Sequence, residues 1–386
     1  MADKLSTLPT ELILIILSHL PLRSLLAFGA TSRLNYERHV LSVKSLRLAV
    51  FQRRLYSMIS FIQAGWVLPG DMLTFDKHPE GADVDCTVSI ILPRTSHVSE
   101  DSLTYPLEGK EWRIRQLMAG RERPRSLAEM VRIQNIIFSK VLSRYGGSLC
   151  HLELMGYDLN MEGAAALGMN CGASLRHLAL RFEHPHVRDG LTRPEAWFGP
   201  PPASTAWNAL GGIGTCKQFG NITRLKTLIL ERAGITPWQL LRLVKKNPEI
   251  TTLKLRTCNG AQPEFLYWLG GLAGAGDGEE DGSPEEESNQ DTHAPGARLK
   301  VLWLENCTQL LSNPSEILDN RDENADTCDR GLEWVRGLKS LESLSFKKCT
   351  NIPSEYADTA NRLLWHIPEL ILPTPLYRQK ASLDSG

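Results

Sequence analysis

The stretch LKVLWLENC, at residues 299–307, holds the clearest copy of a unit that recurs along this chain of 386 residues. The unit reads LxxLxL, with apolar side chains at its first, fourth and sixth positions. Its other copies are LCHLEL at 149–154, LRHLAL at 175–180, LKTLIL at 225–230, ITTLKL at 250–255 and LESLSF at 341–346. Successive copies begin 26, 50, 25, 49 and 42 residues apart, and a weaker copy, VKSLRL, lies at 43–48. Six copies in one chain predict a repeat architecture.

The spacing and the pattern of this unit resemble leucine-rich repeats, whose periods are about 20–29 residues. The longer intervals imply insertions or degenerate units. Because side chains alternate between the two faces of a strand, Leu302 and Leu304 are expected to point into the solenoid. Three cysteines follow the unit at the place where the family has Asn or Cys, and we expect each of them to turn inward and fill the bend. They are Cys258, Cys307 and Cys349.

The segment TPWQLLRLVKKNP, residues 236–248, predicts a helix between two of the units. Thr236 suits the N-cap, Pro237 fits the first helical position, and Gln239 completes a capping box. The segment NPSEIL at 313–318 repeats this pattern. Strand, turn and helix in this order imply a horseshoe, with strands on the concave side and helices on the convex side.

The first forty residues predict a small helical module. Leu12, Ile13, Ile16, Leu17 and Leu20 recur at the spacing of three to four residues that defines one face of a helix. A module of about 40 residues cannot remove most of its apolar surface from water by itself. We therefore expect these side chains to form a docking surface, either for the rest of this chain or for a partner.

The segment LPTELILIILSHLPLRSLLAFGATSR, which begins at Leu8, resembles an F-box. The resemblance departs from the family where Leu34, Asn35 and Tyr36 follow Arg33, a place where many members have Trp. It implies docking onto the Skp adaptor of a cullin–RING ubiquitin ligase. The plain F-box match and the divergent repeats together resemble the many F-box proteins of filamentous fungi. The residues implied to bind the adaptor are Leu8, Pro9, Leu12, Ile16, Leu17, Leu20, Pro21, Leu25 and Leu26.

The fold class expected from both resemblances is α/β: an N-terminal helical F-box at 1–42, followed by a divergent leucine-rich-repeat solenoid at 43–372 with irregular insertions. A C-terminal tail follows at 373–386. Residues 273–297 are rich in Gly, acidic residues, Ser and Pro, which predicts a disordered acidic loop. Residues 49–147 are read as an irregular early part of the solenoid, with a separate small domain as the alternative.

Composition excludes several classes of function. Lys plus Arg number 43 and Asp plus Glu number 44, so no net positive field would gather nucleic acid, and no apolar run is long enough to span a membrane. Eight cysteines without a CxxC pair argue against a disulfide framework and for the cytoplasm or nucleus. We expect no cofactor and no metal, since His184 and His186 stand alone in a Pro-rich stretch.

The two resemblances together imply a substrate-recognition subunit of a Skp–cullin–F-box ubiquitin ligase, with the Skp adaptor, the cullin scaffold and an unidentified target protein as partners. No catalytic motif is present, so the chain is expected not to be an enzyme; a site within 49–147 would be the exception. The other alternative is a leucine-rich-repeat scaffold without a ligase role, capped by its N-terminal helices. The strand positions expected to be exposed for target contact are Glu153, Met155, Arg181, Ile229, Glu231, Lys254, Arg256, Trp303, Glu305 and Lys347.

Overall fold

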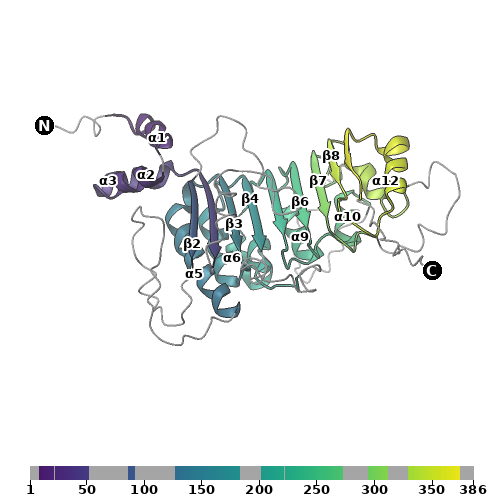
Figure 1. Cartoon of the computed structure of the whole chain (residues 1–386), viewed down its shortest axis with the longest axis horizontal. Coiled ribbons are helices and arrows are strands. Elements are labelled where there is room, and N and C mark those ends of the chain that lie inside the picture. The colour runs from purple at the N-terminus through teal and green to yellow at the C-terminus, as the bar shows by residue number, and fades with distance from the viewer. Residues whose placement is uncertain are drawn as a thin grey trace, which may run out of the picture.

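A computed structural model describes residues 8–20, 22–51, 86–91, 127–182, 201–220, 222–272, 294–311 and 329–373. The described chain has two parts, a group of three helices at the N-terminal end and a long curved sheet backed by helices (Figure 1). Within the described residues, no helix is long and apolar enough to cross a membrane.

The N-terminal part consists of α1 (Thr10–Ser18), α2 (Leu22–Gly29) and α3 (Arg33–Ser42). Pro9 precedes the first helix, where its missing N–H costs nothing. The side-chain oxygen of Ser32 accepts a hydrogen bond from the Asn35 amide at 3.2 Å and so caps α3. Since α1 and α2 both pack on α3, the predicted helical module forms.

In the part of the chain that the structure describes, the sheet has nine parallel strands in the order β2-β1-β3-β4-β5-β6-β7-β8-β9. From β3 onward, neighbours in the sheet follow one another along the chain, as successive repeats of a solenoid do. The strands are β1 (Ser45–Phe51), β2 (Cys86–Ile91), β3 (His151–Gly156), β4 (His177–Phe182), β5 (Thr227–Glu231), β6 (Thr252–Arg256), β7 (Val301–Glu305), β8 (Ser343–Ser345) and β9 (Glu369–Ile371).

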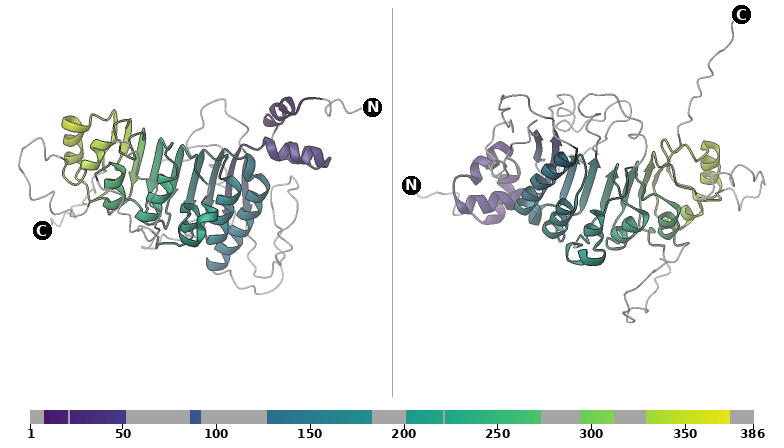
Figure 2. Two further views of the ribbon diagram at one scale, coloured as in Figure 1. Left: turned by 180° about the vertical axis from the view of Figure 1, so that it is seen from behind. Right: turned by 90° about the horizontal axis from the view of Figure 1, so that it is seen from below.

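Helices cover the convex face of this sheet, and the strands line the concave face (Figure 2). The helix predicted at 236–248 is present as α9, and Thr236 and Gln239 form the predicted capping box. The helical elements of this part are α5 (Leu127–Tyr145), η2 (Gly146–Ser148), α6 (Met161–Cys171), α8 (Trp207–Gly211), η4 (Gly214–Phe219), α9 (Pro237–Lys245), α10 (Pro263–Leu269), η6 (Glu333–Gly337), α12 (Ser354–Ala360) and η7 (Asn361–Trp365).

The repeat leucines fill the space between sheet and helices, as predicted. Leu302 and Leu304 of β7 are fully buried, and so are the corresponding leucines of β3 to β6. The thiols of Cys258 and Cys307 lie over the carbonyl oxygens of Leu230 and Leu255, one repeat back, at 3.3 and 3.7 Å. The prediction that these cysteines turn inward and that the chain is an α/β leucine-rich-repeat solenoid is confirmed.

A left-handed residue follows the strand in four repeats, directly after β5, β6 and β7 and three residues after the end of β8. Arg232, Thr257, Asn306 and Lys348 have φ between 50° and 61°, and each precedes the residue that turns inward, which is Cys or Ala. Non-glycine residues rarely adopt this conformation because Cβ then crowds the next carbonyl oxygen. The repeated strain shows that the four repeats from β5 to β8 bend their backbone at the same place.

Several expected segments fall partly or wholly outside the described residues. NPSEIL at 313–318, residues 273–293 of the acidic loop and residues 374–386 of the tail are outside them. The predicted C-terminal boundary of the disordered loop, residue 297, is wrong. Residues 294–297 form a turn, and the Gly296 amide donates to the Leu269 carbonyl at 2.8 Å. The described parts of 49–147 join the repeat domain: β2 pairs with β1, and α5 packs on α6.

Candidate adaptor face and concave strand face

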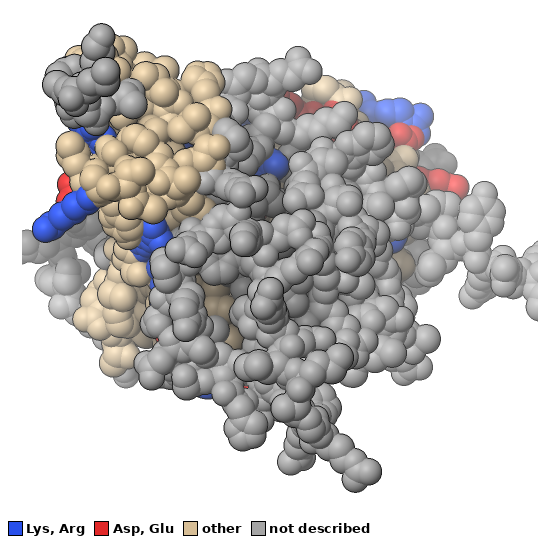
Figure 3. Space-filling view, turned by 60° about the vertical axis from the view of Figure 1, so that its left-hand side comes forward, with Lys and Arg blue, Asp and Glu red and all other residues tan. Residues whose placement is uncertain are grey.

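The first candidate site is the outer face of α1. Leu12, Ile15 and Ile16 are 48%, 57% and 44% exposed, which is unusual for side chains of this size in one short helix. Figure 3 brings this end of the molecule forward, and its described surface is mostly uncharged. Three apolar side chains of α3 are also exposed and were not predicted. They are Leu34, Tyr36 and Leu41.

Other residues expected to bind the adaptor lie elsewhere in the module. Leu17, Leu25 and Leu26 are buried, so their expected availability for docking is wrong. The reason is that α1 is apolar on all sides: Ile13 and Leu17 form its inner face, and Leu12 and Ile16 its outer face. Leu8 and Leu20 are half-buried against the core, Pro9 is exposed, and Pro21 lies outside the described residues.

The inner side of the three-helix module packs on the first repeat. The Ser148 hydroxyl, after α5, lies 2.9 Å from the carbonyl oxygens of both Val40 and Val43. His39 is fully buried and approaches the Tyr145 hydroxyl and the Arg144 guanidinium at 3.4 Å each. Burial, together with the charge of Arg144, lowers the pKa of His39, so the imidazole is held neutral at this junction.

The second candidate site is the concave strand face. The pairing register aligns its side chains in rows across the strands. One row runs Arg47, Glu153, Ala179, Ile229, Lys254, Trp303, and the next runs Met155, Arg181, Glu231, Arg256, Glu305. All the predicted target-contact residues on strands therefore lie on this face, as the alternation predicts; Lys347 follows the end of β8.

The expected exposure of four of these residues is wrong. Glu153, Met155, Arg181 and Ile229 are buried. Neighbouring strands lie about 4.8 Å apart, so side chains in one row cover one another, and long ones leave little open surface. The remaining positions are half-buried. They are Glu231, Lys254, Arg256, Trp303, Glu305 and Lys347.

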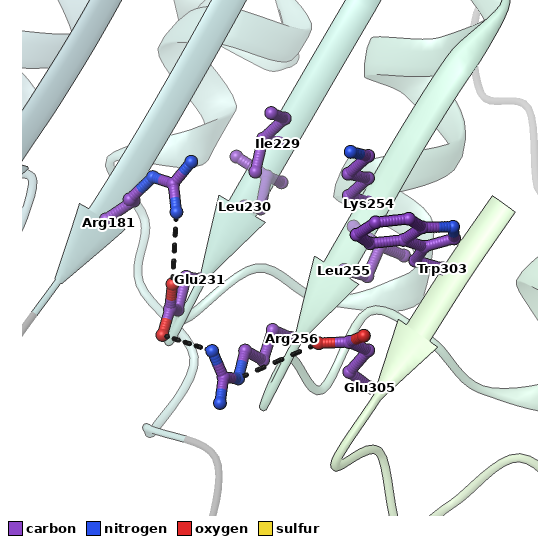
Figure 4. Close-up of a pocket in the computed structure, with 9 residues that line it drawn as sticks. All are labelled: Arg181, Ile229, Leu230, Glu231, Lys254, Leu255, Arg256, Trp303 and Glu305. Carbon is purple, nitrogen blue, oxygen red and sulfur yellow. Dashed lines mark ion pairs between the residues drawn. The ribbon is translucent and has the colours of Figure 1, made fainter. Parts of the chain in front are cut away.

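Charges of the second row pair along the row (Figure 4). Arg181 lies 3.7 Å from Glu231, which in turn lies 3.5 Å from Arg256, and Arg256 lies 4.0 Å from Glu305. The hollow between these side chains and their neighbours is shallow and open to solvent. Small-molecule pockets are enclosed and mostly apolar, whereas this hollow is open and lined by ion pairs, which suits a polar macromolecular surface better.

Trp303 is the largest side chain of this hollow. Its indole N–H donates to the Ser343 hydroxyl at 3.0 Å, and the Lys254 ammonium lies 3.7 Å from the ring centroid. A cation so close to an aromatic face is attracted by the ring. Trp303 is therefore held in place by its neighbours and half-buried, in contrast to the free exposure that the sequence predicts.

Three residues of the concave face were missed by the sequence reasoning. Arg47 contacts the buried carboxylate of Glu153 at 3.3 Å, and His151 contacts the same oxygen at 2.8 Å. Burial alone would raise the pKa of Glu153, but the His151 hydrogen bond and the charges of Arg181, His151 and Arg47 lower it to about 2. The third is His177, which pairs with His151 in register. The signal was in the repeats, because LCHLEL and LRHLAL both carry His at their third position.

The cysteines offer no reactive thiol in the repeat core. Six are described and none is in a disulfide. Burial raises the pKa of the Cys171 and Cys307 thiols to about 12, and it raises that of Cys258 further. Thiols in this state are poor nucleophiles and metal ligands. His184 and His186 lie outside the described residues.

The parallel sheet, the buried leucine rows and the inward-turned cysteines define a leucine-rich-repeat protein. The N-terminal helices form a different domain, since residues 5–36 match the F-box domain family. The chain thus combines an F-box domain with a leucine-rich-repeat domain. Among solved structures it is similar to the leucine-rich repeat-containing protein LegL7 from Legionella pneumophila, at 15% identity and a TM-score of 0.31. That match covers 62% of this chain and 61% of LegL7, and a search of curated proteins found no match.

Proposed function

We propose that this chain is a substrate-recognition subunit of a Skp–cullin–F-box ubiquitin ligase. The observation that carries the proposal is the outer face of α1, where Leu12, Ile15 and Ile16 remain exposed within the matched F-box. Each such side chain contributes about 1.5–3 kcal/mol when a partner buries it. A Skp adaptor would supply that burial and link the chain to a cullin scaffold.

In this proposal the concave strand face binds the target protein. The rows from β3 to β7 present paired Arg and Glu side chains and the Trp303–Lys254 stack, a composition that suits a mixed-charge protein surface. The chain would make no covalent bond. It would raise the effective concentration of a target lysine near a ubiquitin-charged conjugating enzyme. Unpaired, buried thiols agree with a cytoplasmic or nuclear location.

The test is binding of the full chain to purified Skp adaptor, measured by pull-down and by titration. Leu12→Asp combined with Ile16→Asp places two charges on the exposed face, and we expect affinity to fall by at least a hundredfold. Met169→Asp combined with Leu363→Asp is the matched control, because these side chains are 57% and 52% exposed but lie on the repeat domain. Leu17 is unsuitable for this test because it is buried.

The second candidate function is that of a protein-binding scaffold, in which the repeat domain binds a partner and the chain has no ligase role. It is favoured by the packing of α3 on the first repeat through Val40, Val43 and Ser148, which is what a capping module requires. The same titration separates the two functions. If the chain purifies alone as a stable monomer and does not bind the adaptor, it is a scaffold. If the parent chain and the Leu12/Ile16 variant bind the adaptor equally well, the docking site is not on α1.

A further inference from the structure

Two histidines and one glutamate come together at the start of β3 and β4 on the concave face. His151 and His177 are paired in register as the first residues of their strands, and Glu153 stands two residues after His151 on the same side of β3. One ligand atom from each of the three lies within 4.8 Å of the other two. The adaptor docking in the proposed function does not involve this cluster, which lies on the strand face proposed to bind the target.

The glutamate carries an oxygen that the described residues leave without a hydrogen bond. The Glu153 side chain is 2% exposed, and its Oε1 lies 2.8 Å from His151 Nε2 and 3.3 Å from Arg47 Nε. Its Oε2 is buried and accepts no hydrogen bond from any residue in the described ranges. The charge of the carboxylate is balanced by Arg47, Arg181 and His151, but its second oxygen keeps the capacity to bind one more partner.

The two imidazoles are placed to supply nitrogen ligands beside this oxygen. Their rings are stacked with centroids 3.8 Å apart and planes 12° apart, and both are half-buried. Because the lone pair of an imidazole nitrogen lies in the plane of its ring, one ring must rotate out of the stack for both to bind the same metal. Two imidazole nitrogens with one carboxylate oxygen are a ligand set for zinc and neighbouring divalent metals. Calcium and magnesium are less suited, because they prefer oxygen ligands only.

Two guanidinium groups limit how tightly such a metal could bind. Arg47 contacts Glu153, and Arg181 contributes positive charge to the same carboxylate. However, Arg47 approaches Oε1, so a metal can bind at Oε2 without displacing it. The Nε2 of His151 also contacts Oε1, so His151 must either bind the metal through Nδ1 or give up this contact. We therefore expect weaker binding than in a structural zinc site with four thiolate ligands.

We propose that His151, Glu153 and His177 form a binding site for a divalent metal of the zinc class on the concave face. Three protein ligands leave at least one coordination position for water. The site is independent of α1, so its failure would leave the adaptor proposal untouched.

The experiment is a titration of the full chain with ZnCl₂ by calorimetry and with CoCl₂ by visible absorption. We expect one equivalent to bind, and His177→Ala to weaken binding by at least about tenfold, since even changes in the outer shell of a metal site cost about 10–100-fold. His19→Ala removes an exposed imidazole in the F-box and should leave the affinity unchanged. Thermal unfolding without metal shows whether the His177 variant is folded, and His177→Gln replaces it if it is not.

The main alternative is a metal site in which the thiolate of Cys150 is a ligand, because Cys150 is exposed and precedes His151 in the chain. Cys150→Ser should retain the site, and the Co²⁺ complex should lack the intense near-ultraviolet charge-transfer band of a thiolate ligand. Loss of binding in Cys150→Ser, retained affinity in the His177 variants, or no binding by the parent chain would each overturn the proposal.

Discussion

The F-box helices and the repeat domain differ in how completely they bury their apolar side chains. In α1, two of the large apolar residues face the core and three face solvent, although the helix has only nine residues. In β7, the leucines at 302 and 304 are completely buried, and the solvent side carries Trp303 and Glu305 with partners on neighbouring strands. The difference teaches that the repeat domain buries its apolar side chains within its own layers, whereas the described residues leave one apolar face of the F-box uncovered.

The largest difference in stability should appear when one leucine is truncated in each region and the two variants are compared. Leu304→Ala removes a fully buried side chain and should lower the free energy of unfolding by about 2–5 kcal/mol. Leu12→Ala makes the same chemical change on the exposed face and should shift it by no more than about 0.5 kcal/mol. Urea unfolding of the two variants against the parent measures both. Equal losses would mean that Leu12 is already covered within the chain, and the contrast between the regions would be broken.

The same contrast explains which parts of the structure the sequence predicts well. The unit LxxLxL fixes which side chains of β3 to β7 are buried, because the alternation of a strand leaves each residue only two faces. The alternation cannot say how crowded the other face is. Glu153 and Arg181 lie on the predicted side of the sheet and are nevertheless buried, because their partners Arg47 and Glu231 come from neighbouring strands.

The F-box was harder to predict in detail for the opposite reason. Because α1 is apolar on every side, its spacing does not distinguish Leu17, which is buried, from Leu12 and Ile16, which are exposed. The cluster of His151 and His177 was missed because the histidines are 26 residues apart, and only the register of β3 and β4 brings their rings together. Contacts of this kind depend on tertiary alignment and leave only a weak trace in the repeat pattern.

A smaller effect should appear at the bend that the repeats from β5 to β8 share. Thr257 has a φ of 52°, where a β-branched residue is strained, and its hydroxyl accepts a hydrogen bond from Asn306 at 2.9 Å. Thr257→Gly and Thr257→Ala both remove the hydroxyl, but only glycine relieves the strain. We expect the glycine variant to be more stable than the alanine variant by about 1 kcal/mol.

The matched control for this prediction is Thr227, which has ordinary strand geometry in β5. There the order should reverse, because glycine weakens a strand relative to alanine. Chemical unfolding of the four variants gives the two differences. The same order at both sites would show that the left-handed bend carries no strain, and that the repeats are not under the backbone constraint described here.

The smallest effect should come from the junction that joins the two regions. Because burial and the charge of Arg144 lower the pKa of His39 below its ordinary value of 6.5, the unfolded chain takes up a proton more readily than the folded one. Stability contributed by neutral His39 is therefore complete above pH 6.5 and is lost as the pH falls below it. His39→Gln should flatten that part of the pH profile of unfolding, and His19→Gln, at an exposed position, should leave it unchanged. If the His39 variant loses stability with falling pH as steeply as the parent chain, protonation of His39 does not cause this pH dependence. The F-box would then be coupled to the first repeat mainly through its apolar contacts and the Ser148 hydroxyl.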